Sequence, residues 1–135
     1  AGRATYCSAG HPPTMVIRPE SMPLGGGGAR GGEVELLGCQ SGVIGAFEGM
    51  VYETGAFTFA PGDMLFMYTD GTIEARDRTG AFFGEQRLRD LLLSVSGEGV
   101  SGICGKVLGE LDRFTESALD DDIALVSLEF LRGRS

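Results

Sequence analysis

One stretch near the middle of the chain restricts its fold more than any other. Residues 61–76 read Pro-Gly-Asp, Met-Leu-Phe-Met-Tyr, Thr-Asp-Gly and Thr-Ile-Glu-Ala-Arg. The Pro-Gly-Asp segment indicates a turn, because proline presets φ and glycine frees the backbone that follows. The next five apolar or aromatic residues are typical of a strand buried on both faces. This stretch therefore predicts a central strand that ends in a sharp turn.

The residue at the exit of that strand is Asp70, and Gly71 follows it. The strand fixes the direction of the carboxylate, and the glycine keeps bulk away from a bound ion, so the pair suits a hard metal ligand. The alternative is an ordinary Asp-Gly loop dipeptide that closes a strand. The dipeptide alone fits both interpretations, so the flanking residues decide between them.

The flanks of Asp70 resemble a known family. Gly62-Asp63 and residues 68–76 look like the central signature of the metal-dependent serine/threonine protein phosphatases of the 2C type. More narrowly, they are similar to the bacterial branch named after SpoIIE and RsbU. Three further pieces occur in the expected order, namely Ala9-Gly10-His11-Pro12-Pro13, Phe83-Gly84 and Asp121-Asp122-Ile123-Ala124-Leu125-Val126. The resemblance covers nearly the whole chain.

Periodicity and turn residues predict the other elements. Residues 3–8 and 14–18 are expected to form a hairpin, and residues 33–37 and 50–59 add short strands. One amphipathic helix begins at Gly84-Glu85, and a second has Ser101 as its N-cap. Residues 123–130 form a last strand that is apolar enough to be central. The glycine-rich residues 25–32 are expected to be a mobile loop remote from the acids, because the Gly-Lys-Ser/Thr of a phosphate-binding loop is absent.

These elements predict an α+β fold of antiparallel strands with helices on one sheet face. The resemblance implies the α-β-β-α sandwich of the 2C-type phosphatases, of which this chain supplies most of two sheets and one helical layer. In that family an earlier acidic motif, Asp followed shortly by Gly, lies on an early strand, and nothing before Ala9 matches it. Residues 1–135 are therefore interpreted as a single, partial phosphatase domain that lacks its N-terminal part.

Charge and cysteine content limit the partners. The formal net charge is −8, whereas nucleic acids and anionic membrane surfaces demand an excess of Lys and Arg. We therefore expect neither nucleic acid nor a membrane as a partner. The three cysteines show no Cys-x-x-Cys spacing, which indicates reduced thiols and a cytoplasmic protein rather than a zinc site or a disulfide framework.

The acidic residues carry the predicted chemistry. Two divalent ions about 3.5–4 Å apart activate water in metal-dependent phosphoester hydrolysis, and Mn²⁺ and Mg²⁺ prefer oxygen ligands. The resemblance implies Asp70 as one ligand and Asp121, the first acid of Asp-Asp-Ile, as another. The sequence leaves Asp122 open as the alternative, and residues 120–122 also fit a solvated acidic loop. Gly71 contributes through its backbone, and Glu74 is either a supporting acid beside the ligands or an exposed side chain.

The resemblance implies hydrolysis of phosphoserine or phosphothreonine on a partner protein, such as an anti-sigma-factor antagonist, by metal-activated water. Because the earlier acidic motif is absent, the chain holds about half of a two-ion site. We therefore expect the isolated chain to bind Mn²⁺ weakly and to have little or no phosphatase activity. The same absence motivates an alternative, a non-catalytic regulatory or interaction domain on this fold. A strand edge left unpaired near the N-terminus also predicts self-association.

Overall fold

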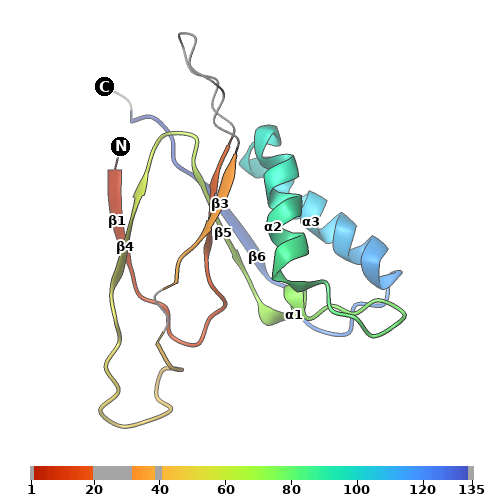
Figure 1. The fold of residues 1–135 in the computed structure, drawn as a ribbon, viewed down its shortest axis with the longest axis horizontal. Coiled ribbons are helices and arrows are strands. Elements are labelled where there is room, and N and C mark those ends of the chain that lie inside the picture. Colours follow the sequence, from red (N-terminus) through yellow and green to blue (C-terminus); the bar gives the residue numbers. More distant parts are fainter. Residues whose placement is uncertain (1, 20–31, 39–40, 134–135) are drawn as a thin grey trace.

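A computed structural model describes residues 2–19, 32–38 and 41–133 of the chain (Figure 1). Most of the glycine-rich segment predicted to be mobile lies outside the described residues. The strands are β1 (Gly2–Tyr6), β2 (Met15–Arg18), β3 (Glu33–Leu36), β4 (Gly55–Phe59), β5 (Met64–Tyr68) and β6 (Leu125–Glu129). The helices are α1 (Asp70–Ile73), α2 (Gly84–Val95) and α3 (Val100–Thr115), with a short 3-10 turn, η1 (Ser96–Glu98), between the last two.

The strands form two antiparallel sheets. A four-stranded sheet has the order β3-β2-β5-β6, and β1 pairs with β4 in a separate two-stranded ribbon. The central position predicted for residues 64–68 is confirmed, since β5 lies between β2 and β6. The α+β class with antiparallel sheets is confirmed as well. Among the described residues, no helix combines the length and the apolar character needed to cross a bilayer.

The hairpin predicted for residues 3–8 and 14–18 is wrong. β1 pairs with β4 in a register that runs from Gly2 opposite Phe59 to Tyr6 opposite Gly55, while β2 pairs with β3 and β5. The segment between β1 and β2 passes from one sheet to the other. Its two prolines cannot donate ladder hydrogen bonds, and Gly10, with φ at 75°, donates instead to the carbonyl of Ser41.

The main core lies between the four-stranded sheet and the two long helices. Figure 1 shows α2 and α3 covering one face of that sheet. Alternate residues of β5 point toward them, and both helices bury a stripe with helical spacing; the buried set includes Met64, Phe66, Tyr68, Leu88, Leu92, Ile103, Val107 and Leu111. Burial of each large apolar side chain contributes about 1.5–3 kcal/mol. Both predicted helices are confirmed, but the N-cap of α3 is Gly99 rather than Ser101, because the backbone enters the helix at a φ of 79° that favours glycine.

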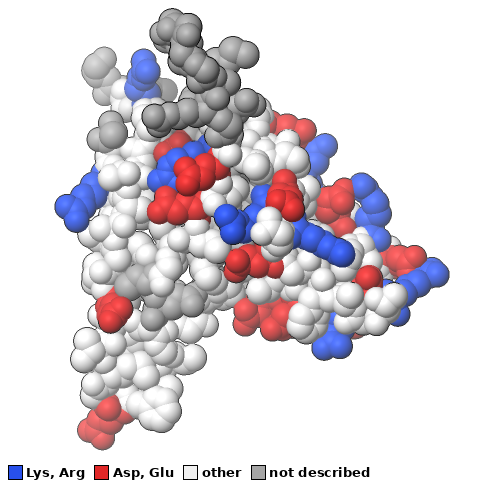
Figure 2. Space-filling model, in the orientation of Figure 1, with Lys and Arg blue, Asp and Glu red and all other residues white. Residues whose placement is uncertain are grey.

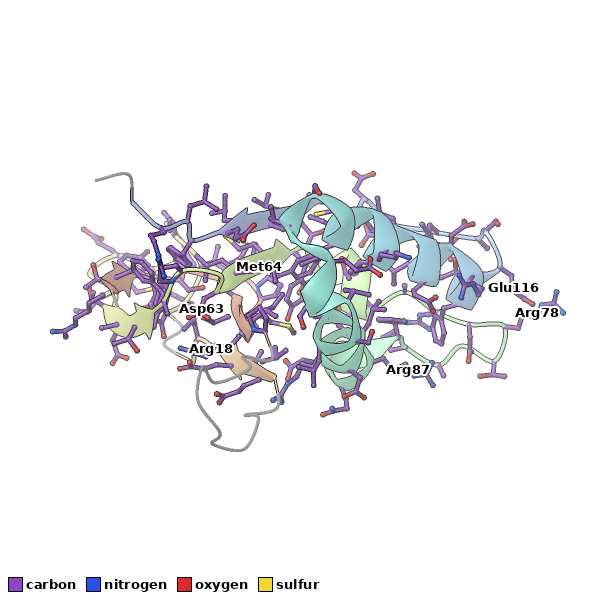
Figure 3. All side chains as sticks on the ribbon, turned by 90° about the horizontal axis from the view of Figure 1, so that it is seen from above. Arg18, Asp63, Met64, Arg78, Arg87 and Glu116 are labelled. Carbon is purple, nitrogen blue, oxygen red and sulfur yellow. The ribbon has the colours of Figure 1, made fainter. Side chains whose placement is uncertain are left out.

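The opposite face of the sheet carries a smaller core. Val16, Leu37 and Phe57 are buried there, and the stacked rings of Phe59 and Phe130, 3.9 Å between centroids, pack beside them. Arg18 ties the ribbon to the sheet, since its guanidinium pairs with Glu35 at 2.5 Å and donates to the carbonyl of Thr58 at 3.0 Å. Figure 3 shows Arg18 beside Asp63, the residue before β5.

The last strand differs from its prediction. Within the part of the chain that the structure describes, β6 is the edge strand of its sheet, not a central one. Leu125 packs against the main core, whereas Val126 and Leu128 are 47% and 49% exposed. These two side chains lie opposite Met67 and Leu65 of β5, on the face away from the helices. The helix-facing positions of β6 are Leu125, Ser127 and Glu129, so its more apolar face is the half-exposed one.

Candidate functional site

The exit of β5 and the loop before β6 are joined by Thr69. Its amide donates to the carbonyl of Ala124 at 3.2 Å. Its hydroxyl donates to the carbonyl of Asp122 at 3.3 Å and accepts a hydrogen bond from the amide of Ala124 at 3.0 Å. Thr69 was not singled out from the sequence, although a threonine directly before Asp-Gly at the end of a strand was the available signal. These bonds place Asp70 beside the acidic run.

Gly71 lies directly against that run. A Cβ atom at Gly71 would stand 2.6 Å from the carbonyl oxygen of Asp122 and 3.4 Å from Oδ2 of Asp121. The first distance is far below van der Waals contact, so this buried position requires glycine. From the sequence alone, Gly71 is expected to keep bulk away from an ion. The structure gives a different reason, which is the close approach of the Asp122 backbone.

The three candidate ligands differ in their surroundings. Asp70 is exposed at the start of α1. Asp121 is exposed as well, and its Oδ1 accepts a hydrogen bond from the amide of Asp122 at 2.8 Å. Asp121 lines a pocket together with Gly71 and Glu74, and Asp122 is not among the described residues that line it. Asp122 instead meets Thr69 through its backbone carbonyl. Of the two alternatives, Asp121 is the one that lines this pocket, and Asp70 itself is not among the described lining residues.

The pocket has a volume of about 200 Å³ and two walls. One wall comes from α1 and the segment after it, and the other from the end of α3 and the loop that follows. The lining residues are Gly71, Glu74, Ala75, Arg76 and Phe82 on the first wall, and Thr115, Ala118, Leu119, Asp120 and Asp121 on the second. Glu74 thus faces the same space as Asp121. Arg76 and Phe82 belong to this site and were not predicted to do so.

The donor chemistry of this end of the sheet suits a hard cation. Its candidate ligands are carboxylates and backbone carbonyls, which are the donors that Mn²⁺ and Mg²⁺ prefer. Among the described residues, however, no group of three or more His, Cys, Asp or Glu side chains is placed to hold a metal ion. The described residues therefore offer suitable donors without closing a complete metal site.

Two buried hydroxyls lie beneath Asp70. Neither the Tyr68 hydroxyl nor Oγ1 of Thr72 has a hydrogen-bond partner within the described part of the chain. Burial, reinforced by the nearby charges of Glu85 and Asp70, raises the pKa of Tyr68 from 10.0 to about 12. The phenol is therefore uncharged at physiological pH, as an exposed tyrosine would be, but with a wider margin.

Comparison with known proteins gives the family of the chain. The family model described as stage II sporulation protein E (SpoIIE) matches residues 1–131. The chain belongs to the SpoIIE family. A relative, protein IcfG of Synechocystis, is 28% identical over 130 residues, which make up 94% of this chain and 18% of IcfG. The resemblance noted in the sequence is thereby confirmed.

Solved structures give the fold of this SpoIIE-family chain. Three matches are the phosphatase domain of SpoIIE from Bacillus subtilis (TM-score 0.73, 15% identity, 98% of this chain and 52% of that one), the RsbU and RsbW domains of Rv1364c from Mycobacterium tuberculosis (0.72, 23%, 97% and 33%) and the SiaA-PP2C domain of Pseudomonas aeruginosa (0.68, 19%, 95% and 46%). The chain thus shares the fold of 2C-type phosphatase domains and spans about half the length of these solved chains or less.

Family membership supports a phosphatase-type function for this chain. Phosphatases of the 2C type depend on metal ions, and one of the matching SpoIIE structures comes from crystals presoaked with manganese. The oxygen donors found at the end of β5 are the kind that such ions require.

Proposed function

We propose that this chain is part of a protein phosphatase domain and contributes Asp70 and Asp121 to its metal site. The domain would hydrolyse phosphoserine or phosphothreonine on a partner protein. The observation that carries the proposal is the closeness of the Asp121 carboxylate to Gly71, the residue that follows Asp70, since a Cβ added there would stand 3.4 Å from Oδ2 of Asp121. Bound Mn²⁺ or Mg²⁺ would supply an activated water and neutralise charge on the phosphoryl group.

The chain's own residues position the two carboxylates. Asp70 is mounted on the end of a buried strand, and Thr69 fastens the opposite loop through three hydrogen bonds. Glu74 lines the same pocket as Asp121 and supports the site as an additional acid. The remaining ligands come from outside the described residues, consistent with a chain that spans 52% of a solved SpoIIE phosphatase domain.

The proposed substrate is a phosphorylated antagonist of an anti-sigma factor. The family resemblance implies this substrate, and one matching structure joins an RsbU domain to an RsbW domain in the same protein. A second candidate function is a non-catalytic regulatory or interaction domain. It is favoured by the absence, within the described residues, of a complete group of metal-ligating side chains.

Hydrolysis of a phosphoserine peptide in millimolar Mn²⁺ tests the proposal. The test uses the chain alone and a longer form that includes the family's earlier acidic motif. We expect little turnover from the chain alone and clear turnover from the longer form. Asp70→Asn and Asp121→Asn should abolish that turnover, while Asp122→Asn, the matched control, should retain most of it.

Each result separates the alternatives. Robust turnover by the chain alone would contradict the half-site argument and support the phosphatase activity. A longer form that binds Mn²⁺ but never hydrolyses the peptide would favour the regulatory domain. Loss of turnover in the Asp122 variant, with Asp121→Asn active, would reverse the assignment of the ligand.

A further inference from the structure

Substrate binding at this site faces an electrostatic obstacle. A phosphoserine side chain carries a charge of about −1.5 to −2 at pH 7, and the chain itself has a formal net charge of −8. The pocket beside Asp121 is also lined by Glu74 and Asp120. A phosphoryl group that enters this pocket therefore needs a cation close to the acids.

A groove leads from the acids to such a cation. A second pocket, of about 480 Å³, adjoins the first and shares four of its lining residues, Arg76, Thr115, Ala118 and Asp120. It extends the space outward to Arg78 and Glu116. The two pockets together form one groove between residues 71–82 and residues 115–121, with Arg76 lining both parts.

The backbone around Arg76 is held by a tight loop. The amide of Phe83 donates to the carbonyl of Ala75 at 2.7 Å, and Arg76 and Phe82 form an isolated β-bridge between these positions. The Asp77 carboxylate closes the loop, since it accepts hydrogen bonds from the amide and hydroxyl of Thr79 and from the amide of residue 81, at 2.7–3.0 Å. Arg76 therefore projects from a fixed frame.

The guanidinium of Arg76 is also restrained, yet it is not neutralised. It lies over the ring of Phe82, 4.8 Å from the centroid, in a cation–π contact. No carboxylate pairs with it within the described residues. By contrast, Arg78, the other cation of the groove, pairs with Glu116, as Figure 3 shows at the far end of α3. Arg76 is thus the cation that the groove leaves available for an anion.

We propose that Arg76 binds the phosphoryl group of a phosphoserine or phosphothreonine side chain in this groove. A guanidinium presents a rigid fork of donors that matches phosphate oxygens, and its prior contact with Phe82 reduces the freedom lost on binding. The inference rests on the proposed function, because it assigns the recognition step to the same pocket. The binding step itself requires no metal ion.

Calorimetric titration in EDTA tests this inference without any turnover. The probes are a short phosphoserine peptide with no other charged residues, the same peptide unphosphorylated, and inorganic phosphate. We expect Arg76→Gln to weaken binding of the phosphopeptide by about tenfold or more, because charge-assisted hydrogen bonds are lost. Arg76→Lys should fall in between, since lysine keeps the charge but not the fork. Arg87→Gln is the matched control, because Arg87 also lies over an aromatic ring, 4.7 Å from the centroid of Phe114, but lines a different pocket; it should change the affinity less than about twofold.

Several outcomes would overturn the inference. They are phosphopeptide binding that survives Arg76→Gln, equal binding of the unphosphorylated peptide, an equal loss in Arg87→Gln, or no phosphopeptide binding by the parent chain. If the chain binds inorganic phosphate but not the phosphopeptide, the assignment of a phosphoserine or phosphothreonine side chain as the ligand is overturned. Because EDTA removes divalent ions, these results are independent of whether Asp70 and Asp121 bind metal, so the proposed function and this inference fail separately.

Discussion

The two faces of the four-stranded sheet are closed to very different degrees. On the helix side, fourteen buried residues form one continuous core, whereas on the ribbon side only three do so among the described residues. The difference follows from the covering layers, since α2 and α3 span the first face and the two-stranded ribbon covers part of the second (Figure 1). The candidate site lies at one end of the helix-covered half, which we call the closed half, where α1 and the end of α3 line the same pocket.

The open half also carries an exposed apolar segment. Val43, Ile44, Phe47 and Val51 are between 59% and 82% exposed. Figure 1 shows this segment projecting below the ribbon, and Figure 2 shows few charges on it apart from one acid at the tip. Contiguous exposed apolar side chains mark surfaces that another chain segment covers. The helix side is therefore closed by its own packing, whereas the ribbon side leaves apolar side chains exposed among the described residues.

The largest expected effect comes from the closed half. Leu92 is fully buried, and Leu93, its neighbour on α2, is 39% exposed. We expect Leu92→Ala to lower the free energy of unfolding by about 2–5 kcal/mol and Leu93→Ala by less than about 1 kcal/mol. Urea unfolding measures both. Equal losses would contradict a core confined to the helix-facing stripe.

A pH-dependent effect comes from Tyr68, also in the closed half. Its folded-state pKa of about 12 lies above the ordinary value of 10.0. The free energy of unfolding is therefore unaffected by Tyr68 ionisation below about pH 10, and it falls as the pH rises from about 10 toward 12. The shift corresponds to about 3 kcal/mol, and Tyr68→Phe should remove this loss. The measurement is urea unfolding at several pH values. Because the hydroxyl has no partner in the described residues, Tyr68→Phe should not destabilise the protein at pH 7. A marked drop in the free energy of unfolding at pH 7 would reveal a hydrogen-bond partner for this hydroxyl.

A smaller effect is expected where the closed half supports the site. Gly71→Ala places a Cβ against the Asp122 carbonyl, and we expect a loss of about 1–3 kcal/mol from this overpacking. Gly105→Ala is the control, since a Cβ there meets no atom within 4 Å and alanine favours a helix interior. Thermal unfolding of both variants checks the prediction. An unchanged midpoint for Gly71→Ala would show that the loop at Asp121 yields easily.

The smallest effect on folding is expected in the open half. Phe47→Ser should change the free energy of unfolding by less than about 0.5 kcal/mol, because its side chain is already exposed. The same change should reduce any self-association, which sedimentation velocity detects. Self-association that persists in this variant would point instead to a free strand edge, such as that of β1, whose partner among the described residues is β4 alone.

The contrast between the two halves also explains which features the sequence predicts. The central strand follows from the continuous apolar run of residues 64–68, and both long helices follow from the helical periodicity of their apolar residues. Asp70 and the acidic run come to the same end of the sheet because β5 ends at Tyr68, opposite Leu125, where β6 begins. The pairing of β1 with β4 joins residues far apart in the sequence, from Gly2 opposite Phe59 to Tyr6 opposite Gly55, and no local pattern encodes it. The apolar content of residues 123–130 predicts a central strand, but within the described residues β6 pairs with β5 alone.

The site residues missed by sequence analysis act through long-range contacts or local loop geometry. Thr69 is recognised by its bonds to residues 122–124, and Arg76 by the groove that it shares with the end of α3. Nothing in the local sequence marks Arg76 as the unpaired cation and Arg78 as the paired one. That distinction appears only once Glu116 is placed beside Arg78.

The most direct test of the central claim, that Asp70 and Asp121 share a metal site, is amide NMR with substoichiometric Mn²⁺. Paramagnetic broadening should begin at Gly71 and at residues 120–122, and it should disappear in Asp70→Asn and in Asp121→Asn but persist in Asp122→Asn. This result would place both carboxylates within reach of one ion, as a two-ion site of the usual spacing requires. Broadening centred on other acids, such as Glu33 and Glu35 of β3, or broadening that survives both Asp70→Asn and Asp121→Asn, would contradict the claim.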